Sequence, residues 1–198
     1  MLKLNTSRLI GLDLAGKSKN PSGIAILEGR NLKARLVYTD TEILEVIEKN
    51  KPELIAIDAP LNTPLQGFSR KADRDMIKNG YRVLPPKLTF MNTLTSRAVK
   101  LNKRIKEKHY RTIEVHPTSS RKALQIALKD WKSIQETLKA LGLQGELQTR
   151  RLITHELDAA TAALTARLHI DNRTDIFGDE EEGYIVVPKK GNWRNLQV

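Results

Sequence analysis

The stretch ELIAIDAPLN, residues 53–62, places an aspartate at the end of an apolar run. Residues 54–57 are all apolar and predict a buried strand, which Pro60 ends because proline does not fit inside a central strand. Asp58 stands at the tip of that strand, where burying a carboxylate is costly unless a partner compensates it. The stretch therefore predicts a strand tip that either makes a turn or serves a function.

The same arrangement occurs at two other places. LIGLDLAG (9–16) carries Asp13, and TIEVHP (112–117) carries Glu114. If these strands are neighbours in a mainly parallel sheet, their acids converge at its carboxyl edge, where open α/β sheets bind ligands. Clustered carboxylates repel one another, and Mg²⁺ or Mn²⁺ relieves that repulsion with oxygen ligands alone. Any one of these acids could simply bond a turn, but their shared position favours a metal site.

A fourth acid lies on a strongly predicted helix, THELDAATAALTARLH (154–169). Asp158 lies beside the apolar stripe of this helix. Small residues such as Ala162 lie on the same side of the helix as Asp158, so the helix could approach the sheet closely there. His155 lies one turn earlier, where it could bind a phosphate, orient a water or relay a proton. The alternative for Asp158 is an exposed acid favoured by the helix dipole.

The order of elements predicts an α/β protein. Strands are expected at 8–14, 23–27, 32–39, 54–58, 112–116 and 178–190, and helices at 40–52, 93–109, 118–129, 131–143 and 154–169. The first three strands form an antiparallel meander and later strands add in parallel, giving one mixed sheet flanked by helices. We expect a single domain over residues 1–198, with a basic, mostly helical insertion at 61–111.

Charge is concentrated in one segment. Residues 70–111 hold 13 of the 34 Lys and Arg residues but 3 of the 23 Asp and Glu residues. Such a localised positive field is typical of nucleic-acid binding, although a solvated basic helix would look the same. Low aromatic content (5%) disfavours base stacking and favours structured or duplex DNA or RNA. The candidate phosphate contacts are Lys17, Arg70, Arg74, Arg97, Lys100, Arg104 and Arg121.

The composition also excludes several classes of protein. The chain has no cysteine, so disulfides, thiolate metal sites and a cysteine nucleophile are excluded. No apolar stretch approaches the roughly 20 residues of a membrane span, and the N-terminus lacks the apolar core of a signal peptide. We therefore expect a cytoplasmic protein with no membrane partner. A homodimer is compatible with the sequence.

Several segments carry a resemblance to known families. A meander, a helix and a strand ending on a second acid resemble the ribonuclease H-like fold, and HELDAATAAL (155–164) resembles the last helix of RuvC-type resolvases. A closer resemblance is to domain-of-unknown-function family 429, whose members are described as nucleases of that fold. It rests on GLDLAG, IDAPLN, RVLPP, IEVHPTSSRKAL, HELDAATAALTA and EGYIVVP.

This resemblance implies two-metal hydrolysis of phosphodiester bonds with Mg²⁺ or Mn²⁺. Asp13 would bridge both ions, Asp58 and Asp158 would each hold one, and Glu114 would ligate directly or through water. His155 would support the ligands or relay a proton.

Two other functions fit the same residues. The first is a non-catalytic nucleic-acid-binding module, in which the acids hold a structural ion or none. The second is a nucleotide phosphotransferase or ATPase of the related actin-like fold, because GLDLAGKSKNPSG (11–23) resembles a phosphate-binding hairpin. That fold needs two such domains, which 198 residues supply only in a dimer.

Overall fold

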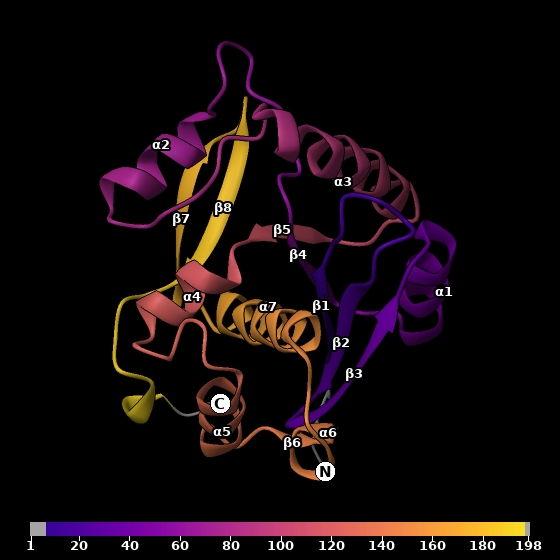
Figure 1. Cartoon of the computed structure of the whole chain (residues 1–198), viewed down its shortest axis with the longest axis vertical. Helices are drawn as coiled ribbons and strands as arrows, with labels where there is room; N and C mark the ends of the chain where they lie inside the picture. The colour runs from indigo at the N-terminus through magenta and orange to yellow at the C-terminus, as the bar shows by residue number, and fades with distance from the viewer. Residues whose placement is uncertain (1–6, 197–198) are drawn as a thin grey trace.

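The computed structural model describes residues 7–196 and contains one eight-stranded sheet. The strand order is β6-β3-β2-β1-β4-β5-β8-β7 (Figure 1). The strands are β1 (Arg8–Asp13), β2 (Ser22–Glu28), β3 (Asn31–Val37), β4 (Leu54–Asp58), β5 (Thr112–Val115), β6 (Gln144–Gly145), β7 (Thr174–Asp179) and β8 (Gly183–Pro188).

The sheet is mixed, as the sequence predicts. β1, β2 and β3 pair antiparallel as a meander, whereas β1, β4, β5 and β8 run parallel to one another. β6 pairs parallel with β3 at one edge, and β7 pairs antiparallel with β8 at the other. The carboxyl ends of β1, β4 and β5 therefore meet at one edge of the sheet.

Helices cover both faces of the sheet. They are α1 (Asp40–Asn50), α2 (Lys71–Lys78), α3 (Thr89–Glu107), α4 (Pro117–Ala123), α5 (Trp131–Ala140), α6 (Glu146–Thr149), α7 (Thr154–Ile170) and the short 3₁₀ helix η1 (Trp193–Asn195). In Figure 1 the meander runs between α7 and α1. Within residues 7–196, no helix combines the length and the apolar character that a membrane crossing requires.

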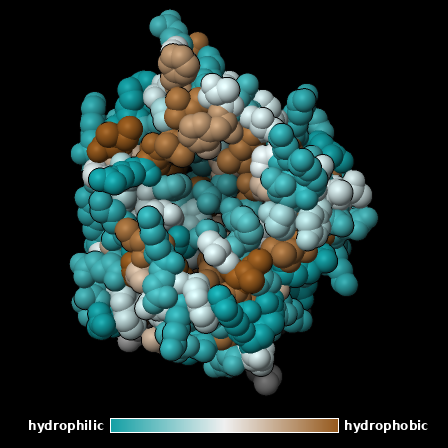
Figure 2. All heavy atoms as spheres, viewed as in Figure 1, coloured by the Kyte–Doolittle hydropathy of each residue, from teal (hydrophilic) through white to brown (hydrophobic). Residues whose placement is uncertain are grey.

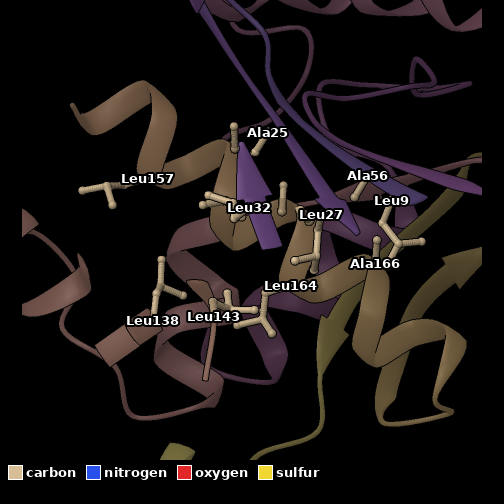
Figure 3. Close-up of a cluster of buried hydrophobic side chains, with 14 of the residues drawn as sticks. Leu9, Ala25, Leu27, Leu32, Ala56, Leu138, Leu143, Leu157, Leu164 and Ala166 are labelled. Carbon is tan, nitrogen blue, oxygen red and sulfur yellow. The ribbon is translucent and has the colours of Figure 1, made fainter. Parts of the chain in front are cut away.

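The alternation of side chains along the strands separates two cores. Leu9, Ala25 and Ala56 face α7 (Figure 3). Ile10, Leu12 and Ile57 face the other way and pack with apolar residues of α1 and α3. Because side chains alternate with a period of two, this division also fixes which face each strand-end acid occupies.

Two glycines bring α7 against the sheet. A Cβ added at Gly11 of β1 would lie 1.9 Å from the carbonyl oxygen of Ala159, and one at Gly23 of β2 would lie 1.9 Å from that of His155. The absence of these side chains lets the helix backbone contact the strands directly. Close packing here sets the position of every residue on the first turns of α7.

Some predicted boundaries differ from the structure. The helix expected at 118–129 ends at Ala123, and Gln125 just beyond it has a left-handed φ of 58°. The last strand, expected behind an acidic turn within 178–190, is β8, which begins at Gly183. The turn joins it to β7, an antiparallel partner that the sequence did not predict. α2 and β6 have no predicted counterpart, because both are short and their stability comes from packing rather than from pattern.

Candidate active site

Asp13 and Asp58 lie side by side at the carboxyl edge of the sheet. They are register partners in the parallel pairing of β1 with β4, and strands are about 4.8 Å apart. Both follow the parity of residues that face α7, namely Leu9 on β1 and Ala56 on β4. Two carboxylates are therefore held on one face of adjacent strand tips.

The first turns of α7 carry the other two predicted residues to this pair. The Nδ1 of His155 lies 2.6 Å from Oδ2 of Asp13, so the imidazole N–H donates to the carboxylate. Asp158 lies one turn further along the helix, and its side chain is 20% exposed. The structure thus brings together Asp13, Asp58, His155 and Asp158, from β1, β4 and α7.

The electrostatics show how closely the carboxylates are grouped. Burial raises the pKa of Asp58 well above its usual value, and the negative charges of Asp13 and Asp158 raise it further. Burial also raises the pKa of Asp158, although the adjacent Arg121 guanidinium opposes that rise. The hydrogen bond to Asp13 raises the pKa of His155. The site therefore has an excess of negative charge that favours binding a cation.

Arg121 supplies a fixed positive charge behind the acids. This residue of α4 is 3% exposed, and its Nη1 donates to Oδ1 of Asp158 at 2.5 Å. The side chain was expected to bind a phosphate beside the N-terminus of its helix. In the structure its guanidinium is buried between α4 and α7 and is bonded to a protein carboxylate.

Glu114 lies on the opposite face of the sheet. It is the register partner of Ile57, one residue before Asp58, so it points away from the aspartate pair. Its two oxygens accept hydrogen bonds of 2.6 and 2.7 Å from Arg70, and one also accepts from the backbone N–H of Leu61 at 2.7 Å. In this structure the carboxylate of Glu114 is thus engaged by Arg70 and by the Leu61 backbone rather than turned toward the aspartate pair.

Arg70 is likewise a structural residue. It is 1% exposed and is shared between Glu114 and Asp73, which it contacts at 2.8 Å. A contact with a nucleic-acid backbone, which was expected of it, is excluded by this burial. The buried cluster instead fixes the start of α2 and the chain segment that follows Asp58.

Both faces of the carboxyl edge open into one cavity of about 210 Å³. Its lining includes Asp13, Asp58, Glu114 and His116, together with apolar residues such as Leu84. Figure 2 shows a hollow near the centre of the same view, bordered above by hydrophobic side chains.

Sequence reasoning did not single out His116. Burial, together with the charge of Arg121, lowers the pKa of its imidazole to about 4. It is therefore neutral at pH 7, and its Nδ1 lies 2.7 Å from Oγ of Ser119. The available signal was its position directly after β5 and before Pro117, at the same edge of the sheet as the acids.

Three basic residues of α3 and its C-terminal end, namely Arg97, Arg104 and Lys108, pair with acids of α1. Arg97 bonds Asp40 at 2.8 Å and also donates to the carbonyl oxygens of Ala15 and Tyr38. Arg104 lies 4.0 Å from the same aspartate. Arg97 thus joins α3 to neighbouring segments through hydrogen bonds and is not a free cation.

Two lysines near Arg97 are exposed to solvent. Lys17 and Lys100 line an open cavity of about 730 Å³ next to the loop that follows Asp13. Neither forms an ion pair with any residue of the described range 7–196. Arg74 is about half exposed and lies 3.6 Å from Glu182.

Comparison with known proteins agrees with this arrangement. The family model described as "Protein of unknown function (DUF429)" matches residues 11–182. The chain is a member of the DUF429 family. No protein with a curated description matches the DUF429 chain in sequence.

Solved structures show the fold. A Thermus thermophilus RuvC bound to a Holliday junction substrate superposes with a TM-score of 0.53 at 14% identity, covering 83% of this chain and 96% of that one. A second Thermus thermophilus RuvC structure has a TM-score of 0.48 and 21% identity over the same shares. The first likeness confirms the predicted ribonuclease H-like fold for the DUF429 chain.

The aspartate pair suits a divalent ion of the Mg²⁺ type. Such an ion is commonly bound through one or two carboxylates and keeps several waters. Within residues 7–196, no group of three or more His, Cys, Asp or Glu side chains is arranged to hold one metal. Asp13 and Asp58 are the carboxylates that could hold such an ion in the DUF429 chain, while Oδ1 of Asp158 is held by Arg121.

Proposed function

We propose that the chain is a divalent-metal-dependent nuclease that hydrolyses phosphodiester bonds of structured or duplex nucleic acid. The observation that carries the proposal is the register pairing of Asp13 with Asp58, joined by His155 and Asp158 from α7. The excess negative charge of this group is difficult to explain as architecture alone, because like charges held close together in a partly buried site repel one another and destabilise a fold.

Each residue has a distinct role in this proposal. Asp13 and Asp58 would hold Mg²⁺ or Mn²⁺, which supplies Lewis acidity and a water activated at neutral pH. His155 holds the Asp13 carboxylate in one orientation through its 2.6 Å hydrogen bond. The exposed ring of His155 also stands where it can exchange a proton with solvent or substrate.

The substrate is proposed to be recognised through its phosphates. Lys17 and Lys100 carry unpaired charges beside the loop that follows Asp13. Contacts to phosphate position a nucleic acid without reading its sequence. The RuvC structure that shares the fold binds a Holliday junction, which makes branched DNA the first substrate to test.

The experiment is a cleavage assay with Mg²⁺ or Mn²⁺ on branched, duplex and single-stranded DNA and on RNA–DNA hybrid. Wild type is compared with Asp58→Asn and with Asp171→Asn, a control at the exposed end of α7. We expect wild type and the control to cleave at least one substrate and Asp58→Asn to cleave none. No cleavage by wild type, with equal nucleic-acid binding by all three proteins, would favour a non-catalytic binding module.

A further inference from the structure

Arg121 is the most deeply buried charge in contact with the acidic group. Besides its 2.5 Å bond to Asp158, its guanidinium lies 3.3 Å from Oγ1 of Thr161 and 3.4 Å from the carbonyl oxygen of Leu128. Its side chain is 4% exposed. These contacts come from α7 and from the segment after α4, while Arg121 itself lies on α4, so the position of the charge is fixed by the fold.

The guanidinium is not fully satisfied by these contacts. Its Nε atom is buried and has no hydrogen-bond partner among the described residues. Leaving a buried donor unpaired destabilises a fold, and an arginine that served only to join two helices would not need that unpaired donor. The arrangement is better explained by a requirement for positive charge at this point.

The charge balance of the site indicates what that requirement is. Asp13, Asp58 and Asp158 bring three negative charges, and Arg121 cancels one of them. A single divalent ion cancels the remaining two, whereas two ions would leave an excess of positive charge.

From this geometry we propose that Arg121 takes the place of a second metal ion, so that the site binds one divalent ion through Asp13 and Asp58. Asp158 is then the partner of a permanent cation rather than a direct ligand. The inference rests on the proposed nuclease function and differs from the two-ion expectation from the sequence. Arg121 is then a positioning residue, which acts on the site through its permanent charge and its bond to Asp158.

The test is the stoichiometry of Mn²⁺ binding, measured by calorimetry and by the electron paramagnetic resonance signal of free Mn²⁺. Wild type should bind one ion per chain, and Asp58→Asn should bind it more than about 100-fold more weakly, beyond the usual effect of an outer-shell change. Asp158→Asn should keep the one-ion stoichiometry. Arg121→Gln should bind a second ion, because Asp158 is then free to ligate.

Arg167→Gln is the matched control, because it removes the same charge from a more exposed position on α7 and should still bind one ion. Arg121→Lys keeps the charge and should also bind one. Two ions on wild type, one ion on folded Arg121→Gln, or loss of the ion in Asp158→Asn would each overturn the inference. If Arg121→Gln does not fold, the wild-type and Asp158→Asn stoichiometries still decide it.

The readout is independent of catalysis. One bound ion without cleavage of any substrate would refute the nuclease proposal and leave the one-ion site standing. Cleavage with two bound ions would support the nuclease proposal and refute the one-ion site.

Discussion

Replacing Gly11 with alanine should move α7 away from the sheet. The new Cβ would lie 1.9 Å from the Ala159 carbonyl oxygen and 2.4 Å from the Ala163 nitrogen, whereas real Cβ contacts are essentially never under 3.0 Å. Both atoms belong to a helix backbone, so no side-chain rotation relieves the clash. The helix must shift by about 1 Å or the strand must bend.

The expected losses of stability and activity follow from this displacement. Overpacking a core costs about 1–3 kcal/mol, and more when the backbone must move. Alanine would otherwise stabilise a strand by about 0.5–1 kcal/mol relative to glycine. We therefore expect Gly11→Ala to lose about 2–3 kcal/mol, and Tm to fall by roughly 4–12 °C for a chain of this size. A shift of about 1 Å in Asp158 and His155 should lower the cleavage rate about 100-fold.

Urea unfolding and the cleavage assay measure the two effects separately. Gly191→Ala is the control, because an added Cβ there meets open space, and its stability should stay within about 0.5 kcal/mol of wild type. If Gly11→Ala were as stable and as active as this control, the close contact between α7 and β1 would not be what positions the site.

Three further predictions concern charge. In EDTA at pH 7, Asp58→Asn should have a higher Tm than wild type, because burial and neighbouring carboxylates raise the pKa of Asp58 in the folded state. Wild type therefore loses stability as the pH rises above about 4, the pKa of an unfolded Asp. The Tm values of the two proteins should converge near that pH. Arg70→Met should destabilise the fold by about 3–5 kcal/mol in urea unfolding, because Glu114 keeps a buried unpaired charge; adding Glu114→Gln should recover part of the loss, and an undiminished loss would contradict the pairing. Lys17→Ala and Lys100→Ala should each reduce the salt dependence of nucleic-acid binding by about one unit of slope in a log–log plot, and unchanged slopes would exclude them as phosphate contacts.

The main features of the fold were readable from local pattern. The apolar runs before Asp13 and Asp58 and the spacing of apolar residues on α7 are properties of single segments, so the sequence shows them directly. β7 was missed because TDIFGD (174–179) contains two aspartates and a glycine, which disfavour strands in isolation. Its pairing with β8 supplies the stability that its own composition lacks.

The sequence predicted which edge of the sheet carries the site, because the ends of strands can be read from it, but not which face of the sheet each acid occupies. The acids of β1, β4 and β5 do reach one edge, but the face that each occupies depends on register. β5 pairs Glu114 with Ile57 rather than with Asp58, and a shift of one residue would have placed it among the ligands. No single-sequence pattern fixes that register.

The roles of the arginines were hidden for a related reason. A basic residue on a helix looks the same in sequence whether it meets solvent or a buried acid. Arg70 meets Glu114 44 residues away along the chain, and Arg121 meets Asp158 37 residues away. Only tertiary structure reveals these two pairings. Localised positive charge was therefore a weaker guide to nucleic-acid contact than its density implied.

A crystal of the protein soaked in Mn²⁺ and measured for anomalous scattering tests the central claim most directly. We expect a single strong peak beside the carboxylates of Asp13 and Asp58, with Arg121 still bonded to Asp158 and no peak at Glu114. A peak at Glu114, or no peak at this edge at millimolar Mn²⁺, would contradict the assignment of the aspartate pair as the metal-binding centre.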